Sequence, residues 1–257
     1  MRRTFLLLFI FTVALAIGSC KKEYSFEGDL EPGKHCIDCA YLPLCDSSTF
    51  RYVDSTAAGV DTLDNIVYIL SDTTVHGVRY SSVSGFDQLG QGLLYNCANG
   101  DYRLLVAVPD MGINIDSIVN DFIQANPLPI PIPLPTISLP TQFSTRIVKT
   151  SLPVNGTWTD TVYSLTIPFL ANVFVGIDYT ILEKGVTRSV LGKSYGNVIH
   201  VQGKVRAAVS ATGFPIPPIP LDFATDYYLA KDVGLVEVDI RQDGIPQLSS
   251  KLWSYHR

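Results

Sequence analysis

The chain has little glutamate, no cluster of basic residues and only one long apolar run. Of its 257 residues 24 are acidic, and only five of these are Glu while 19 are Asp. Because Glu favours helices and Asp favours turns, this imbalance argues against a helical protein. The formal net charge is −5, and without a basic patch the chain lacks the electrostatic footprint of nucleic-acid binding. A nucleic-acid partner is therefore not expected.

Histidine is scarce as well, and no catalytic motif stands out. The four His residues are scattered, and no nucleophile elbow, zinc-protease helix or phosphate loop occurs. His200 lies among apolar residues in a predicted strand, where a structural, hydrogen-bonded role is expected. The sequence therefore predicts a protein that is not an enzyme and that holds no cofactor and no metal.

The one long apolar run lies at the amino terminus. Met1-Arg2-Arg3 gives a positive start, residues 5–17 are apolar apart from Thr12, and Gly18-Ser19 follows. This is the three-part layout of an export signal, and its core is too short for a spanning helix. Cleavage would remove Arg2 and Arg3 and leave 17 basic against 24 acidic residues, a net charge of −7.

The end of the signal is more specific. Ile17-Gly18-Ser19-Cys20 resembles the bacterial lipobox, an aliphatic residue and two small ones before cysteine. The resemblance implies that residues 1–19 are a lipoprotein signal peptide and that Cys20 carries the lipid, palmitate-type acyl chains that anchor the protein to a membrane. Each buried CH₂ group contributes about 0.8 kcal/mol to such an anchor. An ordinary cleaved signal with a chance cysteine is the alternative.

The residue after the anchor bears on which membrane is used. Position 21 is Lys, not the Asp that retains many lipoproteins at the inner membrane. We therefore expect the outer membrane of a Gram-negative bacterium, with the periplasmic and the surface face both open. Residues 20–35, polar and glycine-containing, are predicted to form a tether.

Four further cysteines follow the anchor: Cys36, Cys39, Cys45 and Cys97. An even number in an exported protein predicts two disulfides, in any of three connectivities. A zinc or redox site at the Cys-x-x-Cys of residues 36–39 is the alternative, but zinc would need a matching second pair and a redox site a βαβ context. Residues 36–45 are predicted to form a small cysteine-stapled unit, here called the N-terminal knot, with Tyr41, Leu42 and Leu44 facing inward.

From Phe50 onward, short β-rich runs alternate with turn residues. The predicted strands are 49–53, 65–70, 75–81, 93–97, 102–108, 143–149, 158–167, 173–183, 187–191, 197–210, 223–230, 233–240 and 247–255. Turns are predicted at Asn99-Gly100, at 183–185 and at 192–193, and residues 113–123 form the one predicted helix. The sequence thus predicts a single all-β domain over 36–257, mainly antiparallel. Its strongly curved sheet would form a half-barrel, a barrel or two stacked sheets, with one short helix and long proline-rich loops.

Two segments alternate proline with aliphatic residues, at 126–136 and at 214–221. Proline has no N–H and fixes φ, so neither segment can be a central strand or a helix. Their aliphatic residues form what we call the apolar ladder: Leu128, Ile130, Ile132, Leu134, Ile216 and Ile219. They are interpreted as rigid loops packed on the core, or as an apolar edge that covers a cavity or faces lipid or a partner.

A short pattern, Asp followed by Ser or Thr and then by an aliphatic residue or Thr, recurs five times. It resembles an O-glycosylation acceptor of exported proteins in some Gram-negative bacteria, whereas the alternative is that Asp-Ser and Asp-Thr mark turns. The candidate acceptors are Ser55, Thr62, Thr73, Ser117 and Thr161.

Three segments of the second half, residues 154–159, 195–201 and 227–236, resemble the TapB-like group of exported bacterial domains. That group is itself similar to the lipoprotein-carrier, or Lol-type, fold. The likeness covers about residues 60–257, with Asp232 where the group has glycine. It implies a strongly curved antiparallel sheet around an apolar face and brings no catalytic residues.

Together these features predict a non-catalytic outer-membrane lipoprotein whose β-cup binds an apolar ligand or an envelope partner. Two alternatives stay open: a structural or assembly component of the cell envelope without a ligand, and a surface glycan-binding protein.

Overall fold

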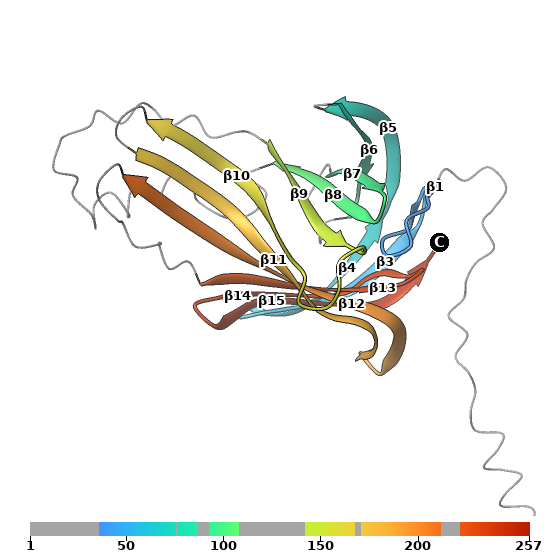
Figure 1. The fold of residues 1–257 in the computed structure, drawn as a ribbon. Helices are drawn as coiled ribbons and strands as arrows, with labels where there is room; N and C mark the ends of the chain where they lie inside the picture. The colour runs from blue at the N-terminus through green and yellow to red at the C-terminus, as the bar shows by residue number, and fades with distance from the viewer. Residues whose placement is uncertain (1–35, 76, 87–92, 108–141, 168–170, 212–221) are drawn as a thin grey trace, which may run out of the picture.

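The computed structural model describes residues 36–75, 77–86, 93–107, 142–167, 171–211 and 222–257 (Figure 1). All regular elements in these ranges are strands, and every strand pair is antiparallel, so the all-β, antiparallel prediction is confirmed. The predicted helix at 113–123 lies outside the described residues. So do Cys20, Ser117 and the six residues of the apolar ladder.

The described residues form fifteen strands. They are β1 (Cys36–Ile37), β2 (Leu44–Cys45), β3 (Thr49–Thr56), β4 (Gly59–Ile66), β5 (Tyr68–Val75), β6 (Val78–Ser84), β7 (Leu93–Ala98), β8 (Asp101–Ala107), β9 (Gln142–Lys149), β10 (Thr157–Ile167), β11 (Ala171–Val190), β12 (Lys193–Ala211), β13 (Phe223–Ala230), β14 (Gly234–Gln242) and β15 (Ile245–His256). Strands β1 and β2 pair only with each other, within the N-terminal knot.

The other strands form two sheets. The larger has eight strands in the order β10-β11-β12-β13-β14-β15-β3-β4, and the smaller has five in the order β5-β6-β7-β8-β9. Neighbours follow the chain order except at β15–β3, where the last strand pairs with a strand from the beginning of the described chain. Figure 1 shows the two sheets as separate curved layers that converge near β4 and β9.

The sheets do not close into a barrel, which corrects the barrel form of the prediction. At one junction the chain passes from β4 into β5 through Val67, whose backbone bonds with Ser47 and Ser48 rather than with a neighbouring ladder. At the other junction, side chains of β10 take up backbone groups of β9. The Arg146 N–H donates to Asp160 Oδ2 over 2.5 Å, and Trp158 Nε1 donates to the Arg146 carbonyl over 2.8 Å. These bonds satisfy both backbone groups of Arg146, and no ladder joins β9 to β10.

Tyrosines fill much of the core between the layers. Tyr52, Tyr95 and Tyr179 are almost completely buried. The Tyr52 hydroxyl donates to the Leu235 carbonyl over 2.7 Å, and the Tyr95 hydroxyl donates to a carbonyl of the N-terminal knot. Burial raises the pKa of all three phenols well above the usual value. These hydrogen bonds satisfy polar atoms that would otherwise be costly to bury.

Strands β11 and β12 form one long hairpin that ends at Leu191-Gly192. The turn predicted at 183–185 is wrong, because β11 runs through it. Register shifts occur instead at Ile181/Glu183, Lys184/Val186 and Val186/Arg188. Such irregularities bend a strand and increase its twist without ending it. As a result, the end of the hairpin curves out of the plane of the long strands, as Figure 1 shows.

Candidate functional site

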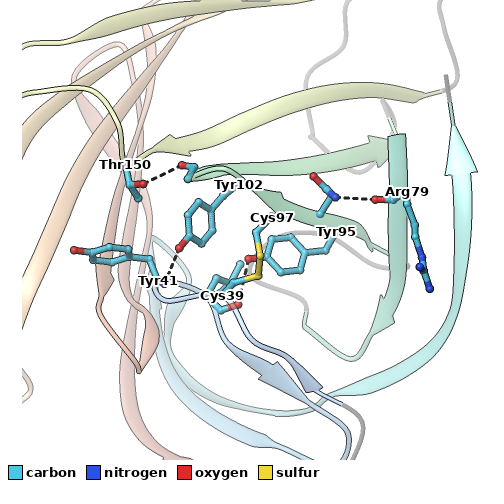
Figure 2. Close-up of a disulfide and its surroundings, with 10 residues drawn as sticks. Cys39, Tyr41, Arg79, Tyr95, Cys97, Tyr102 and Thr150 are labelled. Atoms are coloured by element: carbon cyan, nitrogen blue, oxygen red, sulfur yellow. Dashed lines mark hydrogen bonds between the residues drawn. A yellow bond between two sulfur atoms is a disulfide. The ribbon is translucent and has the colours of Figure 1, made fainter. Parts of the chain in front are cut away.

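The N-terminal knot is closed by two disulfides, Cys36–Cys45 and Cys39–Cys97. Of the three connectivities open to the sequence, this one staples the knot internally and then ties it to β7. All four cysteines are oxidised, so none remains as a thiolate for the alternative zinc site. Figure 2 shows the second disulfide among the aromatic side chains of β7 and β8.

Hydrogen bonds dock the knot onto the body. The Tyr41 N–H donates to the Tyr102 hydroxyl over 3.0 Å, and the Tyr95 hydroxyl donates to the Leu42 carbonyl over 3.2 Å (Figure 2). Leu42 and Leu44 are fully buried and Tyr41 is half-buried, close to the inward orientation expected for all three. The knot therefore fixes the point at which residues 20–35 join the folded body.

A second set of contacts holds the bent end of the β11–β12 hairpin against the large sheet. The Arg188 guanidinium carbon lies 3.4 Å from the centre of the Tyr228 ring on β13, and Arg188 Nε donates to Glu237 Oε2 on β14 over 2.5 Å. Lys251 Nζ of β15 lies 3.5 Å from the other oxygen of the same carboxylate, which is almost fully buried. Burial raises the pKa of Tyr228 to about 12, so its ring stays neutral beneath the cation. We call this set the hairpin clamp.

His200 on β12 extends the hairpin clamp. Its ring stacks on Tyr228 at 4.1 Å between centroids, and its Nε2 lies 2.9 Å from Asp226 Oδ1. Gln202 Nε2 also donates to Asp226 over 3.0 Å, and Arg241 pairs with the other oxygen. Burial alone would raise the pKa of Asp226, but the hydrogen bonds with His200 and Gln202 and the charge of Arg241 together lower it. Asp226 therefore remains a carboxylate.

His200 thus has the structural role expected from the sequence, but its partners were missed. Asp226 and Tyr228 come from β13, and Glu183, whose carboxylate lies 3.5 Å from His200 Nδ1, comes from β11. Their distance along the chain hides them. The alternation on β12 places His200 and Gln202 on one face, but only the strand register brings Asp226 opposite Gln202 and Tyr228 opposite His200.

The chemistry of this network is that of a stabilised ionic cluster. Asp226 and Glu237 each face more than one donor or cation, and the lowered pKa of Asp226 removes it as a general acid or base near neutral pH. Within the described ranges, no group of three or more His, Cys, Asp or Glu side chains is arranged to hold a metal ion.

A hollow of about 360 Å³ with both polar and apolar walls, here called the β6–β8 hollow, lies at the turn ends of β6, β7 and β8. Its polar wall includes Asn96, Asn99, Asp101 and Arg103. Arg103 Nη2 lies 3.5 Å from Asp101 Oδ2, which is long for a hydrogen bond. Within the described part of the chain, the guanidinium of Arg103 is therefore held only weakly. The volume falls within the range of small-ligand sites.

The candidate glycosylation acceptors that the structure describes are all exposed, and each lies inside a strand. Because they are not in turns, the turn explanation does not hold for these four: Ser55 on β3, Thr62 on β4, Thr73 on β5 and Thr161 on β10. Ser55 and Thr62 lie on neighbouring strands, where Thr62 pairs with Val53.

Among the residues that the structure places, no helix is long and apolar enough to cross a membrane.

Comparison with known proteins leaves the chain without a family. No family model and no curated protein matches it. A predicted lipoprotein of Parabacteroides distasonis is similar in structure at a TM-score of 0.39 and 10% identity, over 86% of this chain and 100% of that one. A predicted exported protein with a YmcC-like fold from Bacteroides fragilis gives a TM-score of 0.38 and 9% identity, over 85% and 100%. Likenesses this weak carry no functional argument. The resemblance to the TapB-like group stays a prediction.

Proposed function

We propose that this chain is a non-catalytic lipoprotein of the bacterial outer membrane that works by binding an apolar ligand or an envelope partner. The lipid on Cys20 holds it at the membrane, and residues 20–35 link the lipid to the β body.

The observation that carries this proposal is the disulfide-tied junction between tether and body. Cys36–Cys45 and Cys39–Cys97 lie directly after the tether and connect it covalently to β7. Structural disulfides persist in oxidising compartments, which include the bacterial envelope. The two disulfides therefore fix the point at which the tether meets the folded body.

The ionic network of the large sheet supports a non-catalytic role. Its buried carboxylates are committed to cations, and Asp226 has a lowered pKa. An acid or base for catalysis near neutral pH would need a pKa shifted toward 7.

Anchoring is tested with the variant Cys20→Ser in a Gram-negative host. Wild type is expected in the outer-membrane fraction with incorporated radiolabelled palmitate, and the variant in the soluble envelope fraction without label. An unchanged distribution of the variant would overturn the anchor and with it the proposal.

Binding is tested on acylated protein purified from its native membrane. Organic extraction and mass spectrometry are expected to find a bound apolar molecule, or cross-linking is expected to capture one envelope protein. Replacement of Leu128, Ile130, Ile132 and Leu134 by Ser should abolish whichever is found. Val60→Ser, a change at an exposed aliphatic residue outside the apolar ladder, should not. If neither a bound ligand nor a cross-linked protein is found, the binding role is refuted.

Glycan binding is a second candidate, and the polar side chains of the β6–β8 hollow favour it. Its guanidinium, carboxylate and amide groups offer donors and acceptors side by side, as sugar hydroxyls require. Affinity electrophoresis in polysaccharide gels should retard the protein, and Arg103→Ala should abolish retardation. Arg51→Ala, which removes an exposed arginine on β3 paired with Asp64, is the matched control. Equal mobility of all three proteins in every polysaccharide excludes this candidate.

A further inference from the structure

Leu191 occupies a backbone conformation that leucine rarely adopts. It lies at the end of the β11–β12 hairpin with φ of 48°, followed by Gly192 with φ of 80°. Two-residue hairpin turns of this kind favour Asn, Asp or Gly because both positions need positive φ. Every other described non-glycine residue with positive φ is Ser, Asn or Asp. Leu191 is therefore the exception, and its side chain is 44% exposed.

Trp253 is a second apolar side chain placed outward by an irregular backbone. In the β15–β3 ladder Leu252 pairs with Tyr52 and Ser254 pairs with Arg51, which leaves Trp253 as the extra residue of a β-bulge. Bulges redirect side chains, and Trp253 is 54% exposed although tryptophan is usually well buried. By contrast Trp158, the other tryptophan, is buried.

A hydrogen bond links the end of the hairpin to the bulge. Lys193 Nζ, two residues beyond Leu191, donates to the Trp253 carbonyl over 2.7 Å. The hairpin clamp holds this end of the hairpin in place through Arg188, Tyr228 and Glu237. We call Leu191, Lys193 and Trp253 the apolar tip.

The end of the hairpin carries basic residues and no acidic residue of its own. Residues 184–198 contain Lys184, Arg188 and Lys193. Lys184 Nζ donates to the Thr150 and Leu152 carbonyls and Arg188 is paired with Glu237, so Lys193 is the cation beside Trp253. An exposed aliphatic and an exposed indole side chain beside a lysine have the composition of a membrane-interface contact, where lysines face phosphate groups and tryptophan lies at headgroup depth.

We propose that the apolar tip inserts into the surface of the bilayer that holds the lipid of Cys20, and so sets the orientation of the body on the membrane. This rests on the proposed lipoprotein function. The segment from Cys20 to Cys36, seventeen residues joined by sixteen peptide bonds, spans at most about 55 Å. A domain of this size has a radius of gyration of about 17 Å. The tether therefore lets any face reach the membrane, and contacts of the body must select one.

The experiment uses the acylated mature protein in vesicles of phosphatidylethanolamine and phosphatidylglycerol whose acyl chains are brominated. Bromine quenches tryptophan only at close range, so the lipid should quench Trp253 and leave Trp158 emitting. Trp253→Phe should lose the quenchable component.

Leu191→Asn should lower the insertion equilibrium about tenfold or more, as expected when one leucine side chain is withdrawn from hydrocarbon. Its melting temperature should stay the same or rise, because Asn suits positive φ better than Leu does. Ile245→Asn, a change at an exposed aliphatic residue of the β14–β15 turn, should leave the quenching as in wild type.

Vesicle flotation separates failure of the inference from failure of the anchor. If the protein floats but Trp253 is not quenched, or if Leu191→Asn leaves quenching unchanged, the apolar tip does not contact lipid and this inference alone falls. If the acylated protein does not float, the anchor and the inference both fall. A photo-cross-linker at position 191 that captures a protein, with no lipid quenching, would reassign the tip to a protein partner and overturn the inference.

Discussion

The disulfide Cys39–Cys97 should contribute more to stability than Cys36–Cys45, because it closes a much longer loop. Its cysteines are 58 residues apart, against 9 for the other pair. In the chain-entropy model the long loop gives about 4.2 kcal/mol and the short loop about 2.6 kcal/mol, a difference of about 1.6 kcal/mol. Each pair has one buried and one partly buried cysteine, so the loss of packing in the alanine variants is similar.

The comparison is made in a Cys20→Ser background, which removes the predicted acylation site. Cys39→Ala/Cys97→Ala and Cys36→Ala/Cys45→Ala are unfolded in urea under oxidising conditions, and the free energy of unfolding is measured for each. Since domains are stable by only about 5–15 kcal/mol, the first variant should lose a large part of its stability. An equal cost for the two variants, or a larger cost for the short loop, would refute the loop-length argument.

Three further predictions concern the large sheet and its surface. Asp226→Asn should cost about 1–3 kcal/mol at pH 7, because Arg241 loses its ion pair and His200 and Gln202 lose a charged hydrogen-bond partner. Because the pKa of Asp226 is lowered in the folded protein, its contribution is complete above the unfolded pKa of about 3.9 and disappears as the pH falls through the folded pKa. Urea titrations should therefore show wild type and variant converging in acid, and a gap independent of pH would contradict this. Gly203→Ala should cost about 1–3 kcal/mol, because its Cβ would lie 2.8 Å from the Tyr179 ring. Gly196→Ala is the control, since a Cβ there meets nothing within 4 Å. Equal shifts in melting temperature for the two variants would argue against the clash. Intact-mass measurement of protein from the native host should show sugar increments that disappear when the exposed acceptors are replaced by Ala, and a mass without increments would end the glycosylation hypothesis; these acceptors are Ser55, Thr62, Thr73 and Thr161.

Turn chemistry made part of the fold predictable. Asn99-Gly100 predicted a hairpin, and the structure has both residues at positive φ between β7 and β8. Here the local preference and the long-range pairing agree. At Glu183-Lys184-Gly185 they disagree, since the turn-like residues lie at bulges whose pairing to β12 keeps β11 continuous.

Strand β4 shows why some elements could not be predicted in full. Most of its residues from Gly59 to Ile66 are exposed, so the strand lacks the alternation of buried and exposed residues that signals a half-buried strand. The predicted strand at 65–70 is divided at Val67, where the chain changes sheets. Which sheet a strand joins depends on the strands that pair with it. The residues around Val67 do not reveal those partner strands, so the change of sheet could not be predicted there.

The candidate site was the least predictable part. The hairpin clamp joins Arg188, Tyr228, Glu237 and Lys251, which come from four different strands. None of these residues forms a local motif, and each could equally be a solvated surface group. The apolar tip had a visible signal, however: leucine immediately before Gly192 in a tight hairpin is a local mismatch between residue and turn.

The backbone of Asp232 brings the two ends of the described chain together. Its N–H donates to the Ala40 carbonyl over 2.6 Å, and its carbonyl accepts from Arg257 Nη1, also over 2.6 Å. A fluorescent protein or affinity tag fused to the carboxyl terminus would thus emerge beside the N-terminal knot. The Asp243-Gly244 turn between β14 and β15 is the better insertion point for a reporter, since nothing lies within 4 Å of a Cβ built at Gly244.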